Sequence, residues 1–392
     1  MSHAASCGGC RCDVLVVLRH GRDGASLAHG NRYAGEHVRS VHVSVLGMGS
    51  RKRLAMRKRM KALDCGLFNA SPLSHAVSSP AQKILDEYRR QDRVHAGSLI
   101  ISVLGDAVMP RGGRVWLGSL IRLLAPLGVN ERLVRTAVFR LVRDEWLTSE
   151  RSGRRTDYLL TPSGEQRIDE ASRLIYAGSM PQWDRRWRLI VTAGELSTKD
   201  RERLRKALLW HGFGSLNNDC FVHPSVDLIA VFDALAAEGL GGLVDRLKPL
   251  IAADAALGMA ASDAAMVRWA WDLEQLAEMY RDFVARYRPA LGQLRDGGLE
   301  TADETAFLLR VLLIHDYRRL LLRDPSLPGV LLPPDWPGQK ARLLCSELYR
   351  RLLVPSERHL DAAFQLADGV VPGASARLHE RFRDTDLLAL PA

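Results

Sequence analysis

Residues 130–143 read Asn-Glu-Arg-Leu-Val-Arg-Thr-Ala-Val-Phe-Arg-Leu-Val-Arg, a pattern that predicts an amphipathic helix. At 100° per residue, its apolar side chains share one arc of a helix and are expected to face a core. That arc consists of Leu133, Val134, Ala137, Val138 and Leu141. The opposite arc, beside Glu131, consists of Arg132, Arg135, Thr136, Arg140 and Arg143. Asn130 is a good residue to cap the helix N-terminus.

The arginine-rich arc is typical of a helix that enters the major groove of DNA. Arginine binds guanine O6 and N7 through two hydrogen bonds or contacts phosphate, and Asn130 would bring the helix N-terminus close to the DNA backbone. A charged face that meets only solvent is the alternative. Phe139 interrupts the polar arc. It either contacts a thymine methyl group or is covered by a neighbouring domain.

The flanking sequence favours DNA over solvent. A short amphipathic helix is predicted over 116–124, followed by the tight turn Ala-Pro-Leu-Gly that ends at Gly128. Two β-prone runs, 146–150 and 156–160, come directly after the arginine-rich helix. The turn between them carries three cations that would reach adjacent phosphates, namely Arg151, Arg154 and Arg155.

Two further helices, over 98–108 and 161–176, complete this first folded region. Pro110 to Gly113 breaks the first of them. The resulting order is helix, helix, helix, hairpin, helix. This is the order of a winged helix-turn-helix.

A different pattern begins near Trp183. Strand-like and helix-like runs alternate there, which favours a small ferredoxin-like α+β unit. The runs are a strand over 188–192, a helix over 197–210 capped by Ser197, an extended run over 213–222, a helix over 226–238 and a loop over 239–242.

The last third of the chain is predicted to be mostly helical. An aromatic and apolar stripe repeats at steps of three and four residues, which indicates core or dimer packing. The stripe is Trp269, Leu273, Leu276, Tyr280, Phe283 and Tyr287. Further helices are expected over 304–322 and 340–354, with a Pro-rich loop over 325–338 between them.

The expected fold class is therefore α+β and multidomain. A winged helix-turn-helix is followed by a ferredoxin-like α+β domain and a mostly helical C-terminal domain. The boundaries are a disordered basic extension over 1–80, a DNA-binding domain over 81–178, a central domain over 183–265, an effector and dimerisation domain over 266–375 and a tail over 376–392.

The net charge of +10 is concentrated at the N-terminus. Residues 1–75 contain 12 Lys and Arg against 4 Asp and Glu, so the folded body is close to neutral. Cys7, Cys10 and Cys12 have a spacing that metal sites use, but no matching second pair accompanies them, so we expect no metal. The other cysteines are too scattered for a disulfide framework, and no apolar run is long enough for a membrane helix. A cytoplasmic location is expected.

Several segments in collinear order over about residues 95–365 resemble the PaaX family of transcriptional repressors. They include Gly105-Asp-Ala-Val-Met-Pro-Arg-Gly-Gly113, residues 115–122, residues 130–144 and Trp183-Asp-Arg-Arg-Trp187. The later ones are His315-Asp-Tyr-Arg-Arg319, Leu322-Arg-Asp-Pro325 and Leu332-Pro-Pro-Asp-Trp-Pro-Gly338.

The resemblance implies a homodimeric repressor of an aromatic-acid catabolic operon. Such a repressor binds double-stranded promoter DNA and is released by an aryl-CoA thioester, phenylacetyl-CoA, as effector, without another cofactor. A site for this thioester needs cations for its phosphates and an apolar slot. The candidates are His315, Arg318, Arg319, Arg323 and Trp336.

The resemblance also implies a central domain like that of a CRISPR-adaptation nuclease, which leaves a metal-dependent nucleic-acid-processing enzyme as the alternative. In that nuclease fold, a metal-binding aspartate ends the first strand. This chain offers only Glu195 near that position, which disfavours nuclease activity. No hydrolase or transferase motif is present, so no catalytic residues are expected.

Overall fold

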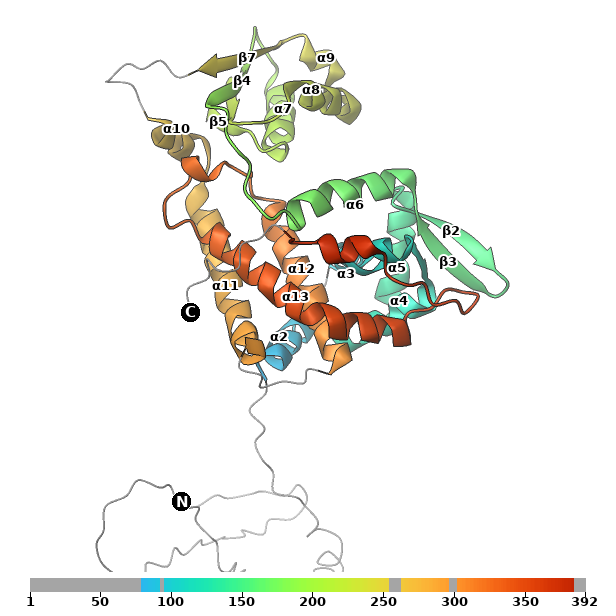
Figure 1. The fold of residues 1–392 in the computed structure, drawn as a ribbon. Coiled ribbons are helices and arrows are strands. Elements are labelled where there is room, and N and C mark those ends of the chain that lie inside the picture. The colour runs from blue at the N-terminus through green and yellow to red at the C-terminus, as the bar shows by residue number, and fades with distance from the viewer. Residues whose placement is uncertain (1–78, 92–94, 254–261, 296–301, 384–392) are drawn as a thin grey trace, which may run out of the picture. The chain divides into compact units, whose positions relative to one another are not determined.

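The computed structural model describes residues 79–91, 95–253, 262–295 and 302–383 (Figure 1). These residues all belong to one of the two compact units of the chain, residues 78–392. The predicted basic extension therefore lies outside the described residues, except for Ser79 and Pro80. Those two residues begin a helix, because Ser79 caps its N-terminus and Pro80 is its first residue.

The region around the arginine-rich stretch is built from helices that surround an apolar core. Gly112 and Gly113 end the first long helix with positive φ angles, as the Pro-Gly break predicts. The helical segments are α2 (Pro80–Arg89), α3 (Ala96–Val103), a π-helical turn η1 (Leu104–Val108), η2 (Met109–Arg111), α4 (Leu117–Leu124), η3 (Ala125–Leu127), α5 (Glu131–Arg143) and α6 (Pro162–Ile175).

A three-stranded antiparallel sheet accompanies these helices. Its order is β1 (Arg114–Trp116), β3 (Arg155–Leu160) and β2 (Leu147–Ser152). The hairpin β2–β3 confirms the two predicted β-prone runs. The expectation that Trp116 begins a helix was wrong, since Trp116 ends β1 and pairs with Asp157 of β3.

The central domain is a four-stranded antiparallel sheet with the order β5-β6-β4-β7. Its elements are β4 (Arg186–Thr192), α7 (Thr198–Trp210), β5 (Gly214–Asn217), β6 (Cys220–His223), α8 (Leu228–Leu235), η4 (Ala236–Leu240), α9 (Gly241–Val244) and β7 (Leu247–Ala253). This strand order is that of a ferredoxin-like fold, as predicted. The predicted loop over 239–242 is mostly helical instead, and the sequence pattern did not indicate β7.

The C-terminal third is helical, as predicted. Its helices are α10 (Asp263–Ala270), α11 (Leu273–Arg295), α12 (Asp303–Leu321) and α13 (Pro337–Ala363), with short turns η5 (Gly329–Leu331) and η6 (Ala376–Glu380). The predicted stripe is buried along α11 from Leu276 to Tyr287, and Leu273 is half-buried. Trp269 lies in the separate helix α10 and is 67% exposed. Including Trp269 was wrong because the chain is extended at Trp271, which interrupts the helical period.

One continuous apolar core joins the first and last thirds of the folded chain. It includes Leu99 of α3, Val134 of α5, Tyr287 of α11 and Leu348 of α13. Figure 1 shows α12 and α13 lying against the helices of the first third. The domain boundaries remain predictions, but these two regions are packed as one body.

The expectation of a tail over 376–392 was wrong for its first residues. Leu378 and Phe382 are buried in the same continuous core, and Phe382 packs against the rings of Tyr176 and Tyr349. Within the described residues, none of the helices has the length and apolar content that crossing a bilayer requires.

Candidate nucleic-acid interface

Helix α5 begins as its sequence predicts. The side chain of Asn130 accepts a hydrogen bond from the Leu133 backbone N–H at 2.9 Å. Val134, Ala137, Val138 and Leu141 are buried against the core. Leu133 is 40% exposed, so placing it in the core was wrong. It lies at the edge of the apolar arc, in the first turn of the helix.

The opposite arc of α5 lies at the surface. All its predicted members, Arg132, Arg135, Thr136, Arg140 and Arg143, are exposed. Arg135 pairs with Glu131 at 2.6 Å, and Arg143 pairs with Asp144 at 2.9 Å. Among the described residues, Arg132 and Arg140 have no carboxylate partner. These two guanidinium groups are available to an anionic surface.

Phe139 lies in the same surface arc and is 71% exposed. No described part of the chain covers it, so the neighbouring-domain alternative has no support within this unit. An aromatic side chain surrounded by arginines is costly to leave in water, which is typical of a contact surface.

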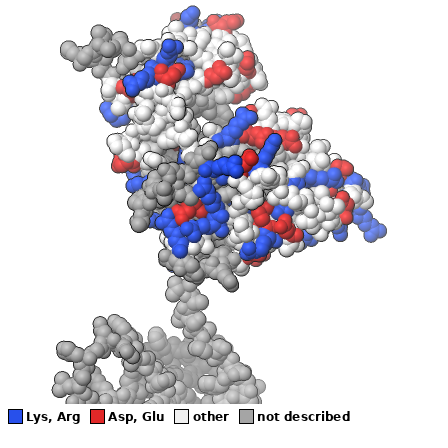
Figure 2. Space-filling view, in the orientation of Figure 1, with Lys and Arg blue, Asp and Glu red and all other residues white. Residues whose placement is uncertain are grey.

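The hairpin β2–β3 places more cations near α5. Its two-residue turn contains Gly153, which has a φ of 60°. Arg151 and Arg154 are exposed at this tip. Figure 2 shows basic side chains at the free end of the hairpin. These side chains extend the positive surface beyond α5.

Arg155, the third cation of the predicted hairpin tip, contacts the protein itself. Its guanidinium lies 4.5 Å from the ring centroid of Trp116 and donates to the Ala367 carbonyl at 3.3 Å. The cation–π contact and this hydrogen bond hold Arg155 toward the body of the protein. Arg151 and Arg154 are therefore the freer cations of the hairpin.

The five predicted effector residues lie along α12 and the loop after it, but they differ in burial and in the residues that they contact. His315 is buried, and its Nδ1 lies 3.1 Å from Ser102 Oγ. Burial, with Arg318 and Arg319 nearby, lowers the pKa of His315 to about 3. Arg318 donates to Ser98 Oγ at 2.7 Å. Both side chains therefore join α12 to α3.

The other three effector candidates differ in how far they are buried. Trp336 is buried with its ring edge against Tyr280 at a centroid distance of 5.9 Å. Arg319 and Arg323 are exposed at the end of α12. Of the five candidates, these two arginines are the exposed ones.

Sequence reasoning missed a buried charge network in the shared core. Asp106 of η1 pairs with Arg310 of α12 at 2.8 Å and with Arg381 at 2.9 Å. Arg111 pairs with Glu357 of α13 at 2.7 Å, and Arg310 also contacts Glu357. The only signal in the sequence was the presence of these charges within otherwise apolar helical runs.

The two arginines control the protonation of Asp106. Burial alone would raise the pKa of this carboxyl group, but Arg310 and Arg381 outweigh burial and hold the pKa below its usual value. Tyr176 and Tyr349 also donate hydrogen bonds to Asp106, at 2.7 and 3.0 Å. The network therefore contains an ionised carboxylate with several donors.

The central domain contains Glu195, the one acidic candidate for a nuclease site. Glu195 is exposed just after β4, and its backbone carbonyl accepts a hydrogen bond from Arg246. In the described ranges, no group of three or more His, Cys, Asp or Glu is arranged to hold a metal ion. The cysteine run Cys7–Cys12 lies outside these ranges.

Three family models match successive parts of the chain between residues 95 and 362. Residues 95–164 match the family model of a PaaX-like protein, residues 180–248 match the PaaX protein central Cas2-like domain, and residues 271–362 match the PaaX-like protein C-terminal domain. The chain belongs to the PaaX family. The resemblance drawn from the sequence is thereby confirmed.

A relative in the PaaX family is the transcriptional repressor PaaX of Escherichia coli (strain K12). It is 37% identical over 292 residues, which cover 74% of this chain and 90% of the relative. Among solved structures, an uncharacterized protein from Mycobacterium tuberculosis is matched with a TM-score of 0.43 and 23% identity. It is matched over 66% of this chain and 98% of its own.

Proposed function

We propose that this protein is a DNA-binding transcriptional repressor that binds promoter DNA through a winged helix-turn-helix. The recognition helix is α5, the helix before it is α4, and the wing is the hairpin β2–β3. The observation that carries the proposal is the exposed arc of α5, where Arg132 and Arg140 have no carboxylate partner among the described residues. Membership of a family that includes a transcriptional repressor supports the same function.

The chemistry of each residue assigns it a role on DNA. Arg132, Arg135, Arg140 and Arg143 contact guanine edges or phosphates in the major groove, and Thr136 supplies a hydroxyl group. Phe139 contacts a thymine methyl group. Asn130 brings the N-terminus of α5 to the DNA backbone, while Arg151 and Arg154, with a smaller contribution from Arg155, contact flanking phosphates.

A homodimer fits this mode of binding. Two copies of α5 would enter successive major grooves about 34–36 Å apart and read a partly palindromic promoter. The effector is an aryl-CoA thioester such as phenylacetyl-CoA. It favours a state of the dimer in which this spacing is wrong, so its differential affinity for the two states releases the DNA. The protein would act in the cytoplasm.

The decisive experiment is fluorescence-anisotropy titration of the full chain with promoter DNA from its own operon, with and without phenylacetyl-CoA. We expect specific binding that the thioester abolishes and that free phenylacetate leaves unchanged. Specific binding that ignores the thioester would remove the effector from the proposal. Absence of specific binding would overturn the repressor function.

The alternative function is metal-dependent processing of nucleic acid by the central domain. The Cas2-like match of residues 180–248 is the observation that favours it. Incubation of the full chain with Mg²⁺ and labelled DNA or RNA tests it. Cleavage that disappears in Glu195→Ala would support this activity, whereas we expect none.

A further inference from the structure

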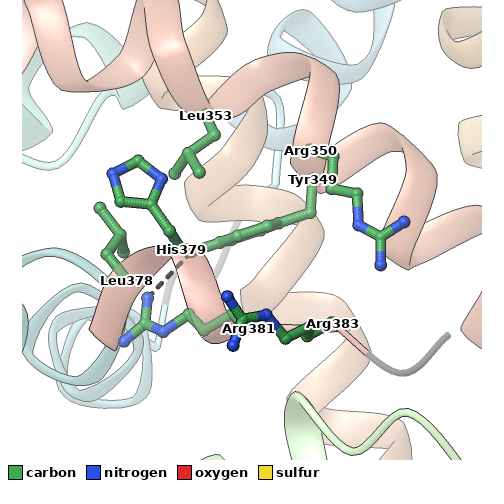
Figure 3. A pocket seen from close by; sticks show the side chains of 7 residues that line it. All are labelled: Tyr349, Arg350, Leu353, Leu378, His379, Arg381 and Arg383. Carbon is green, nitrogen blue, oxygen red and sulfur yellow. Dashed lines mark hydrogen bonds between the residues drawn. The ribbon is translucent and has the colours of Figure 1, made fainter. Parts of the chain in front are cut away.

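A cavity of about 340 Å³ lies between the middle of α13 and η6 with the residues that follow it (Figure 3). Its lining is Tyr349, Arg350, Leu353, Leu378, His379, Arg381 and Arg383. Three of these residues are arginines and one is a histidine, and none is acidic. The remaining wall is a tyrosine and two leucines. The lining therefore combines positive charge with apolar side chains.

The arginines of this cavity differ in how they are compensated. Arg381 is mostly buried and pairs with Asp106. Arg350 donates to the backbone carbonyl of Phe382, and neither Arg350 nor Arg383 pairs with a carboxylate among the described residues. Guanidinium groups that share a hollow repel one another, and a bound anion would turn this repulsion into attraction.

We propose that this cavity binds the phosphate-bearing part of the CoA thioester, an inference that rests on the proposed function. Arginine matches the oxygens of phosphate through paired hydrogen bonds. Ligand pockets usually measure about 300–1,000 Å³, so a cavity of this size holds one part of a large ligand. Leu353 and Leu378 supply an apolar wall beside the charges.

Arg381 connects the cavity to the DNA-binding region. Besides Asp106, it donates to the Gly105 carbonyl at 2.9 Å and lies 4.2 Å from the ring centroid of Tyr176. Gly105 and Asp106 belong to η1, between α3 and the sheet that includes the wing, and Tyr176 directly follows α6. A phosphate in the cavity competes with Asp106 for Arg381. Ligand binding and the arrangement of the DNA-binding helices are thereby coupled, and the coupling is reciprocal.

The test compares three double variants of the full chain by isothermal titration calorimetry. Arg350→Gln with Arg383→Gln removes two cations of the cavity. Arg319→Gln with Arg323→Gln removes the accessible pair at the end of α12. The matched control, Arg268→Gln with Arg288→Gln, removes the same charge from exposed positions on α10 and α11. Each variant is titrated with phenylacetyl-CoA, coenzyme A and phenylacetate.

We expect the cavity variant to bind phenylacetyl-CoA and coenzyme A at least tenfold more weakly, with the other two variants close to the unmodified protein. Phenylacetate should not distinguish the variants, because it has no phosphate. All variants should keep their melting temperature and their affinity for DNA without ligand. In hydrogen exchange, phenylacetyl-CoA should change protection in both 104–108 and 376–383 of the unmodified protein.

Equal thioester affinity in the cavity variant and the control would overturn the cavity assignment while leaving the repressor function intact. A loss confined to the α12 variant would do the same and would move the site to Arg319 and Arg323. If phenylacetyl-CoA does not release DNA from the unmodified protein, the proposed effector fails separately. In that case, direct titration with coenzyme A tests the cavity. Binding to the unmodified protein that is lost in the cavity variant would support the site, and no binding to either protein would overturn it.

Discussion

Helices α5 and α12 both combine arginines with apolar side chains, but the arginines of α5 are exposed whereas Arg310 of α12 is buried. On α5, one face is buried and the arginines of the other face are exposed. On α12, apolar side chains are buried on nearly every side, and Arg310 is 0% exposed. The difference shows that arginine content alone does not identify a ligand-binding surface. What surrounds the helix decides whether its charges meet a partner or the protein itself.

The surroundings of α12 explain its internal use of charge. This helix packs against α2, α3, α6, α11 and α13. A buried guanidinium must find carboxylates or hydrogen-bond acceptors within the protein, because desolvating it alone is very unfavourable. Arg310 pairs with Asp106 and Glu357, and Arg318 donates hydrogen bonds to Ser98 and Ser102.

The largest effect is expected from breaking the internal charges. Arg310→Met removes one of the two arginine partners of Asp106 and one of the two of Glu357, leaving Arg381 and Arg111 respectively. We expect a loss of about 3–5 kcal/mol in the free energy of unfolding. Urea denaturation measures it. Adding Asp106→Asn should not recover the loss, because Arg381 would then lose the carboxylate with which it pairs. A change below about 1 kcal/mol would show that the network contributes little.

On α5, the same kind of substitution should affect DNA rather than stability. Arg140→Ala is expected to weaken operator binding by about 1–3 kcal/mol if the side chain reads a base. Its exposed position predicts a change in unfolding free energy within about 0.5 kcal/mol. Anisotropy and urea denaturation give the two numbers. Arg135→Ala is the companion variant, because Arg135 already pairs with Glu131. Unchanged operator binding in both variants would contradict the docking of α5.

The buried side chain of His315 should make the stability of the protein depend on pH. Its pKa of about 3 in the folded protein is below that of an unfolded histidine. Between these values the unfolded state binds more protons, so stability falls as pH drops below about 6.5. The loss by pH 5 is about 2 kcal/mol relative to neutral pH. His315→Gln should flatten this part of the pH profile of unfolding, and a profile identical to that of the unmodified protein would refute the burial argument.

The smallest effect is expected at the tip of the wing. Arg154→Gln should weaken binding to all DNA sequences alike and reduce the slope of log affinity against log salt by about 1, because a single phosphate contact is lost. Anisotropy titrations at several salt concentrations, on operator and unrelated DNA, measure both properties. A loss restricted to the operator would instead indicate that Arg154 reads sequence.

Much of the local structure followed from the sequence. Asn130, Ser197 and Thr161 cap the helices that they were expected to begin, because a side-chain oxygen next to a helical run satisfies a free backbone N–H. β1 and β7 were missed. Both are strands whose pairing partners are distant along the chain, Arg155–Leu160 for β1 and Arg186–Thr192 for β7. Strands of this kind are stabilised by their neighbours more than by their own composition.

The residue pattern was enough to predict the apolar and charged faces of α5, the hairpin beside it and the family of the chain. These features depend on residues close together in the chain. Packing was needed to show that Arg155 lies over the Trp116 ring and that His315 and Trp336 are buried. It also showed that Asp106, Arg310 and Arg381 meet in one network. Their partners lie up to hundreds of residues away along the chain. Helical period shows which side chains share a face, whereas only packing shows what that face meets.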